Sequence, residues 1–213
     1  MEMKVKKLAR EIRELCSLIK GDLLAIPPND PACRNLWEAW FCYPGFDAIF
    51  RHRIEHILWN HGWKFIARRL SKRTRRLTGV DIHPAAKIGR RFFLDHATGA
   101  VVGATAIIGD DVVMFHEVTI GGTGKGLPNE RRHAIIGNRV FLSTGAKIIG
   151  PVTISDDVKI GACTVVLESI SSHNTAVGGH LFRTIPHNNS AEVVETVGAQ
   201  DGQGNTNPEG VSV

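Results

Sequence analysis

The chain has 213 residues, of which 43% are hydrophobic and 22% charged, and its formal net charge is +5. This length suits one large domain, or one domain with a small appendage, and it is long enough to bury a substantial core. No apolar run approaches the roughly 18 residues of a membrane span. The charged N-terminus does not read as a signal peptide, and four cysteines without CxxC or disulfide spacing indicate a reducing, cytoplasmic location.

The first 78 residues have the spacing of helices. Leu8, Ile12, Leu15 and Leu18 recur every three or four positions, and the stretch "PPNDPA" should interrupt that first helix. A second helical stretch follows, and the segment that begins at "PGFDAIF" fits one or two more.

Two features of this helical region have an ordinary explanation. His52 and His56 could share one face of a helix, as a metal pair would, but no third ligand is evident nearby in the sequence. We therefore interpret them as packing or surface histidines. The basic run at 67–79 is interpreted as a solvated helix face, since no aromatic side chains interleave with it as in a nucleic-acid site.

Residues 80–170 repeat every six positions. The repeated aliphatic positions fall in three frames: Ile82, Ile88 and Leu94; Val102, Ile108, Met114 and Ile120; Ile136, Leu142, Ile148, Ile154, Ile160 and Val166. Ordinary strand alternation would not hold one residue type at this period. The pattern predicts a parallel β-helix in which each unit forms one side of a triangular prism, with its aliphatic side chain inward. The N-terminal helices would then cap one end.

The frame slips twice, and these insertions should emerge as loops. Two extra residues lie between Leu94 and Val102, and the longer insertion gives a loop at 121–135. We expect three parts: a helical region at 1–78, a β-helix domain at 79–186 and a flexible tail at 187–213, which is rich in Asn, Gly and Ser.

The motifs "DIHP", "LDHATG", "GGTGK", "RRH" and the upstream "DPA" resemble those of serine O-acetyltransferases, which belong to the left-handed β-helix, hexapeptide-repeat acyltransferases. The similarity runs from Asp30 to Val177. It implies an α+β fold, with an N-terminal helical segment, a left-handed parallel β-helix and a tail. It also implies an acetyl-CoA-dependent enzyme that transfers acetyl to the hydroxyl of L-serine, giving O-acetyl-L-serine for cysteine biosynthesis.

The resemblance also assigns roles to single residues. His96 matches the catalytic general base, and Asp81 matches the carboxylate that orients it. Fifteen residues separate the two, a little less than one coil, so they could face each other across adjacent coils. The other matches are Asp30 and Asp95 for the serine ammonium group, Arg132 and His133 for its carboxylate, and Gly122, Thr123, Thr144, Gly145 and Ala162 for the coenzyme A groove.

These residue types suit the chemistry. A neutral imidazole can remove the serine proton as the hydroxyl attacks a thioester, and a carboxylate on the other ring nitrogen fixes the tautomer. A zwitterionic acceptor needs acids for its ammonium group and a planar guanidinium for its carboxylate. No metal is required. Asp81 could instead cap a turn, Arg132 could be a solvated loop charge, and His83 is better explained as a structural residue of the first coil.

The sequence departs from the family at several positions around the acceptor. Ala104 stands where the family usually has Glu, His116 and Glu117 replace a Gln and a small residue, and Ala134 replaces a Pro. These changes leave open an acyltransferase of the same fold that acts on another hydroxyl acceptor, such as homoserine or a sugar. A β-helix metalloenzyme and a non-catalytic scaffold are the remaining alternatives; the first lacks an HxxxxH pair within the repeat, and the second does not explain the acid–base pair.

The resemblance extends to assembly. Active sites of related enzymes lie between neighbouring prisms, and little chain precedes Asp30, so a homotrimer is expected rather than a hexamer. Relatives often bind O-acetylserine sulfhydrylase through a C-terminal isoleucine. This chain ends in Val213, which buries one methylene fewer at a cost of about 0.8 kcal/mol, so weak or absent binding of that partner is expected. No nucleic acid or membrane partner is expected.

Overall fold

The computed structural model describes residues 2–124 and 130–178, with the backbone alone for residues 2–8. The predicted tail at 187–213 and part of the predicted loop at 121–135 lie outside the described residues. Residues Met1–Gly179 form one compact unit.

Helices form the N-terminal part of this unit: α1 (Glu2–Leu24), α2 (Ile26–Asn29), α3 (Leu36–Cys42), α4 (Pro44–Asn60) and α5 (Lys64–Thr78). The first helix ends at Leu24, before the prolines that were expected to interrupt it. Pro27 lies in the first turn of α2, where a missing amide hydrogen costs no helical hydrogen bond. Gly79 ends α5 in the left-handed conformation, with φ of 74°, and the amide of this residue donates to the carbonyl of Arg75.

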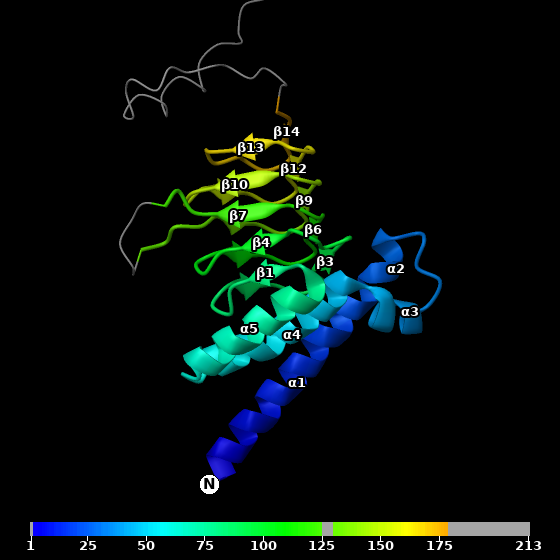
Figure 1. Cartoon of the computed structure of the whole chain (residues 1–213), viewed down its shortest axis with the longest axis vertical. Coiled ribbons are helices and arrows are strands. Elements are labelled where there is room, and N and C mark those ends of the chain that lie inside the picture. Colours follow the sequence, from blue (N-terminus) through cyan, green and yellow to red (C-terminus); the bar gives the residue numbers. More distant parts are fainter. Residues whose placement is uncertain (1, 125–129, 179–213) are drawn as a thin grey trace, which may run out of the picture. The chain divides into compact units, whose positions relative to one another are not determined.

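Short strands follow: β1 (Asp81–Ile82), β2 (Lys87–Ile88), β3 (Phe93–Leu94), β4 (Val101–Val102), β5 (Ile107–Ile108), β6 (Val113–Met114), β7 (Thr119–Gly121), β8 (Ile135–Ile136), β9 (Phe141–Leu142), β10 (Lys147–Ile149), β11 (Thr153–Ile154), β12 (Lys159–Ile160), β13 (Val165–Val166) and β14 (Thr175–Ala176). They pair in parallel to form three sheets. Sheet A has the order β1-β4-β7-β10-β13, sheet B β11-β8-β5-β2 and sheet C β14-β12-β9-β6-β3. From β1 to β13, every third strand therefore returns to the same sheet, and the coils stack as Figure 1 shows.

The aliphatic positions of the six-residue repeat form the core. All thirteen occupy the second residue of strands β1 to β13, and all are buried. Between coils they stack in register; for example, Ile82 pairs with Val102, which pairs with Ile120. Full burial of such a side chain stabilises the fold by about 1.5–3 kcal/mol. The parallel β-helix predicted from the repeat is confirmed.

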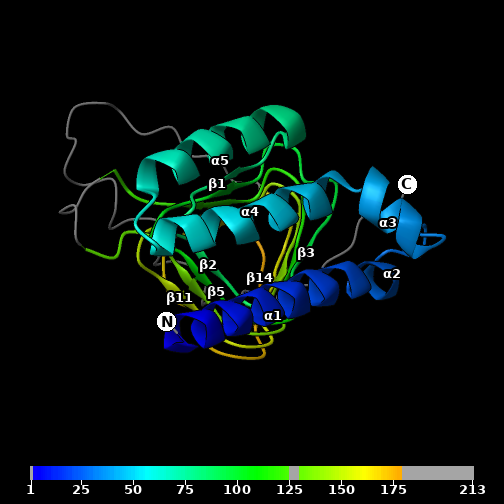
Figure 2. The same cartoon turned by 90° about the horizontal axis from the view of Figure 1, so that it is seen from below.

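The helices cover the first coil, as the view from below shows (Figure 2). Arg53 of α4 and Asp22 of α1 make a bidentate ion pair at 3.0 and 3.1 Å, and both side chains are buried. The same guanidinium donates to the carbonyls of Ile88 and Gly89, and Asp22 accepts from the amide of Phe92. One buried pair therefore joins two helices to the first coil.

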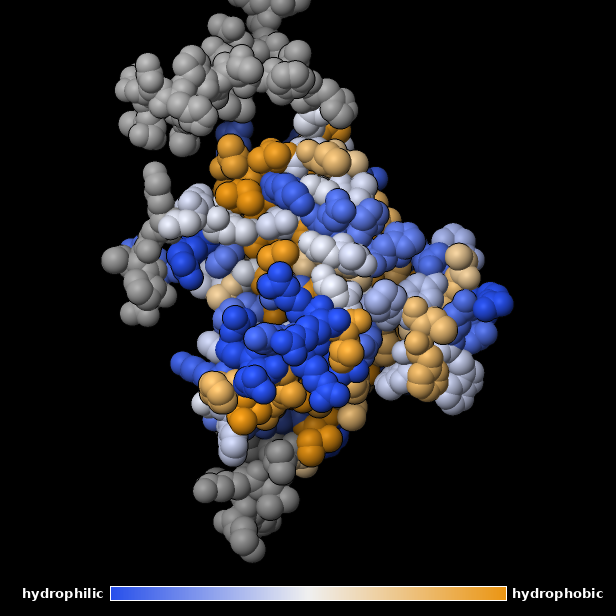
Figure 3. All heavy atoms as spheres, viewed as in Figure 1, coloured by the Kyte–Doolittle hydropathy of each residue, from blue (hydrophilic) through white to orange (hydrophobic). Residues whose placement is uncertain are grey.

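Helix α5 presents the basic run at the surface. Six cationic side chains of this run are exposed, Arg68, Arg69, Lys72, Arg73, Arg75 and Arg76. The surface over α5 is strongly hydrophilic in Figure 3. At the far end of sheet A the surface is hydrophobic, with Val165 and Leu167 exposed. The expectation of a solvated helix face agrees with this exposure.

Candidate active site

The predicted site residues lie along two borders of sheet A. We call the turns that lead from sheet C into sheet A the C-to-A turns (95–100, 115–118, 143–146 and 161–164), and those that lead from sheet A to sheet B the A-to-B turns (83–86, 103–106, 122–134 and 150–152). On the C-to-A turns lie Asp95, His96, Thr144, Gly145 and Ala162. On the longest A-to-B turn lie Gly122, Thr123, Arg132 and His133.

The candidate base His96 projects from the first C-to-A turn. Its backbone has φ of 54°, in the left-handed region that an L-residue adopts only in tight turns. The amides of Ala97 and Thr98 close this turn on the carbonyls of Asp95 and His96. The His96 side chain is 72% exposed, and its Nε2 lies 3.7 Å from the carboxylate of Asp95. The imidazole is therefore free to meet a ligand or a neighbouring molecule.

Asp30 belongs to the same cluster. It ends α2, and its carboxylate accepts a hydrogen bond from the Tyr43 hydroxyl at the start of α4 and from the Ala32 amide at 2.8 Å. These hydrogen bonds lower the pKa of Asp30, and the charge of His96 lowers it further to a small degree. The Asp30 carboxylate, whose ionised form is favoured, therefore lies in the electrostatic field of His96, as an ammonium-binding group requires.

The structure does not pair Asp81 with His96 inside one chain. The Asp81 carboxylate projects from β1 on the outside of sheet A and pairs with Arg75 of α5 at 3.0 Å. In the part of the chain that the structure describes, no ion pair or hydrogen bond links it to His96. The expected contact across adjacent coils is thus absent from the single protomer, in which the Asp81 carboxylate pairs with Arg75.

Arg132 and His133 lie next to each other on the opposite border. The Nε atom of Arg132 is buried without a hydrogen-bond partner among the described residues. The His133 ring is half-buried, and burial together with the charge of Arg132 lowers its pKa. An unpaired guanidinium nitrogen beside a neutral imidazole can receive an anionic group such as a carboxylate.

Comparisons with known proteins agree with this geometry. The family model for the bacterial transferase hexapeptide (six repeats) matches residues 133–168. The serine acetyltransferase of Mycobacterium tuberculosis is 45% identical over 164 residues, which cover 77% of this chain and 71% of that protein. The serine acetyltransferase of Helicobacter pylori (strain 26695) is 50% identical over 150 residues, 70% of this chain and 86% of that protein.

The chain belongs to the serine acetyltransferase family. Two solved structures of serine acetyltransferases extend the match. The Neisseria gonorrhoeae enzyme in complex with serine has a TM-score of 0.75 and 39% identity, over 79% of this chain and 68% of that one. The Brucella abortus enzyme in complex with coenzyme A has a TM-score of 0.76 and 40% identity, over 78% and 66%. The predicted fold class, helices followed by a left-handed parallel β-helix, is confirmed.

In this member of the serine acetyltransferase family, one contact of His96 was not predicted from sequence. The His116 ring lies edge-on to the His96 ring, with centroids 5.6 Å apart, and its Nε2 is 2.7 Å from the Thr144 hydroxyl. Its Nδ1 is buried without a partner among the residues described. The sequence marked His116 only as a departure from the family, and no spacing rule pointed to this contact. The contact of Tyr43 with Asp30 was also not predicted, since no spacing rule pointed to it.

The residues predicted for coenzyme A are open to solvent to different degrees. Gly122, Thr123 and Ala162 are exposed, Thr144 is half-buried and Gly145 is buried. Gly145 has φ of 68°, and a side chain there would meet the Cys163 sulfur at 3.1 Å. Thr144, Gly145 and Ala162 share the C-to-A border with His96, whereas Gly122 and Thr123 lie on the border with His133.

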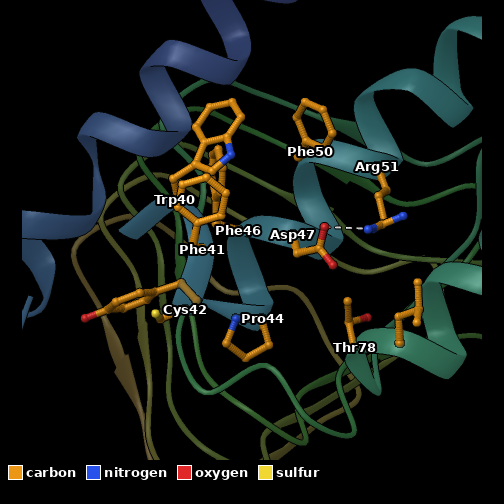
Figure 4. A pocket seen from close by; sticks show the side chains of 11 residues that line it. Trp40, Phe41, Cys42, Pro44, Phe46, Asp47, Phe50, Arg51 and Thr78 are labelled. Atoms are coloured by element: carbon orange, nitrogen blue, oxygen red, sulfur yellow. Dashed lines mark hydrogen bonds and ion pairs between the residues drawn. The ribbon is translucent and has the colours of Figure 1, made fainter. Parts of the chain in front are cut away.

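Two further features carry none of the predicted site residues. A hollow of about 480 Å³ lies between α3, α4 and the end of α5, lined by Trp40, Phe46 and Phe50 and by the Asp47–Arg51 ion pair (Figure 4). His83 packs edge-on against Trp59 with centroids 4.9 Å apart, and burial lowers its pKa to about 4.

No described group of histidine, cysteine and acidic side chains has the arrangement of a metal site. None of the described helices is both long and apolar enough to span a membrane. All four cysteines are free thiols.

Proposed function

We propose that this chain is an acetyl-CoA-dependent serine O-acetyltransferase that makes O-acetyl-L-serine for cysteine biosynthesis. The observation that carries the proposal is the exposed His96 beside Asp95 and Asp30, in a chain whose relatives include structures with serine and with coenzyme A. Both substrates bind non-covalently in this scheme, and no metal takes part.

His96 acts as the general base. Its neutral imidazole accepts the proton of the serine hydroxyl as the oxygen attacks the thioester carbonyl. The tetrahedral intermediate then collapses, the carbon–sulfur bond breaks, and the imidazolium returns the proton to the departing thiolate. Base assistance of this type contributes about 10²–10⁴ in rate.

The serine zwitterion is held at its two charged ends. The carboxylates of Asp30 and Asp95 receive the ammonium group, since Asp95 lies 3.7 Å from His96 and Asp30 lies in the electrostatic field of the same ring. Arg132 and His133 receive the carboxylate through the unpaired Nε atom and the imidazole. The two ends thus draw on residues from both borders of sheet A.

This division indicates a site shared between two protomers. In a homotrimer, the C-to-A border of one protomer would face the A-to-B border and sheet A of its neighbour, and His96 would meet Asp81 of that neighbour. The Asp81 carboxylate would then orient the imidazole and stabilise the imidazolium. The pantetheine arm of acetyl-CoA would lie between the same borders, near Gly122, Thr123, Thr144, Gly145 and Ala162.

Location and partners remain part of the proposal. Free thiols support a reducing cytoplasmic environment. The weak or absent binding of a sulfhydrylase concerns residues 204–213, which lie outside the described residues, and it remains a prediction. The division into regions at 1–78, 79–186 and 187–213 also remains a proposal.

An end-point assay of thiol release from acetyl-CoA tests the function. We expect release with L-serine that exceeds the release with homoserine, threonine and amino sugars. Greater release with homoserine or an amino sugar would favour the alternative acceptor and overturn the assignment. If folded protein that binds acetyl-CoA releases no thiol with any acceptor, the assignment as an acetyltransferase is overturned.

A further inference from the structure

The end of the longest A-to-B turn is fastened to Thr105. The backbone amides of Arg132 and His133 donate to the Thr105 hydroxyl oxygen at 2.9 and 3.1 Å. The same oxygen lies 2.8 Å from Nδ1 of His133, and the Thr105 amide donates to that Nδ1 at 3.3 Å. One threonine therefore contacts both residues that we assign to the serine carboxylate.

These contacts determine where the protons are. A hydroxyl has one hydrogen to donate and two lone pairs to accept with. Because two amides donate to the Thr105 oxygen, its hydrogen is directed to Nδ1 of His133. The Thr105 amide also donates to Nδ1, so this nitrogen faces two donors and carries no proton. A neutral His133 must then carry its proton on Nε2.

The backbone leaves Nε2 room to act. A Cβ atom on Gly103 would lie 1.9 Å from Nε2 of His133, so only glycine lets the ring take this position. A Cβ atom on Gly122 would lie 3.6 Å from the same nitrogen. Within residues 2–124 and 130–178, no group accepts a hydrogen bond from Nε2. The Nε2–H thus lies beside the Gly103 backbone, has no partner among these residues and is left for a ligand.

We infer that Thr105 is a positioning residue that fixes His133 as a neutral Nε2–H donor for the carboxylate of the acceptor. The inference rests on the proposed function for the identity of the ligand. The tautomer itself rests on the contacts of Thr105 alone. Protonation of His133 would add a hydrogen to Nδ1, which already faces two donors.

The first test reads the tautomer directly and needs no activity. Nitrogen-15 NMR of the full chain, labelled at histidine, separates the protonated from the unprotonated ring nitrogen of each imidazole. Comparison with His133→Gln assigns the His133 signals. We expect the proton on Nε2 in the native chain and in Thr105→Ser, and a mixture of tautomers in Thr105→Val, which keeps the shape but loses the hydroxyl. A proton on Nδ1 in the native chain, or an unchanged tautomer in Thr105→Val, would overturn the inference.

The second test reads the role in binding. Thr105→Val should raise KM for serine about tenfold, as the loss of one hydrogen bond to a charged group predicts. KM for acetyl-CoA should stay near its native value, and Thr105→Ser should restore KM for serine. Serinamide, which lacks the carboxylate, should be affected much less. An equal loss for serine and serinamide would show that Thr105 has only a structural role.

The two tests distinguish failure of the proposed function from failure of the positioning role of Thr105. If the native chain turns over no serine, the proposed function fails, while the NMR result still decides the tautomer. If serine is turned over but Thr105→Val leaves its KM unchanged, the proposed function stands and the positioning role of Thr105 is excluded.

Discussion

His96 owes its candidate role to the turn that carries it. The insertion of two residues after Leu94 lengthens this C-to-A turn, and the left-handed backbone at His96 presents the ring to solvent instead of the core. Asp95 beside it is largely buried, with a side chain 16% exposed. One exposed base and one sheltered acid therefore come from adjacent residues.

Replacement of His96 should remove the chemistry and leave coenzyme binding intact. We expect His96→Ala to lower turnover by about 10²–10⁴, since general-base assistance is lost. KM for acetyl-CoA should change little. His173→Ala is a matched control, because His173 is similarly exposed but lies several coils away. The measurement is thiol release at saturating substrate, and near-native turnover of His96→Ala would refute the mechanism.

His52 should make the stability depend on pH. It is 1% exposed, and burial lowers its pKa well below the ordinary 6.5, with smaller contributions from Arg53 and His56. Below pH 6.5 the unfolded chain gains a proton that the folded chain excludes. The free energy of unfolding therefore falls as the pH falls, by up to about 1.4 kcal/mol per pH unit for this group.

The experiment compares the native chain with His52→Phe. Urea unfolding at several pH values between the folded pKa and neutrality gives the free energy of unfolding for each protein. The slope of this free energy against pH should be smaller in the variant, whatever its stability at pH 7. Identical slopes would mean that the folded chain protonates His52 as readily as the unfolded chain does, and would contradict the prediction.

At the scale of elements, the buried ion pair between Asp22 of α1 and Arg53 of α4 links both helices to the first coil. Asp22→Leu should destabilise the chain by about 3–5 kcal/mol, because it leaves the Arg53 charge buried without a counter-ion. The double variant Asp22→Leu with Arg53→Met should recover much of that loss, since no unpaired charge remains. Urea unfolding measures both, and a double variant as unstable as the single one would contradict this account.

The sequence predicts those structural elements that follow from a repeated pattern or from neighbouring residues. The six-residue period identified all thirteen inward side chains, because each coil repeats the same packing problem. Pro27 shows the limit of a local rule: the first helix does end before it, at Leu24, but Pro27 itself lies in the first turn of a short helix. The contacts of Thr105, Tyr43 and His116 join residues far apart in the chain, and no periodicity encodes them.

The candidate site illustrates the same limit. The residue matches placed Asp81 and His96 within one coil of each other, and that separation suggested a direct contact. The period gives the position along the prism but not which border a side chain faces, or that Arg75 occupies the Asp81 carboxylate.

At the scale of the whole molecule, the residues proposed for the site fall into two groups on one protomer. His96, Asp30 and Asp95 lie at one border of sheet A, while Arg132 and His133 lie at the other. A trimer that joins unlike borders would complete three equivalent sites, since a closed ring repeats the same heterologous contact. The central claim is that each site combines His96 of one protomer with Asp81 of its neighbour.

Co-expression of two weakened variants tests this claim most directly. His96→Ala and Asp81→Ala, purified together as mixed trimers, should regain activity, because about a quarter of the interfaces then pair a native His96 with a native Asp81. Thiol release from acetyl-CoA with serine should exceed the mean of the two variants measured alone, and light scattering should give the mass of a trimer. Mixed trimers with no gain above that mean, or a monomer with full native activity, would contradict the shared site.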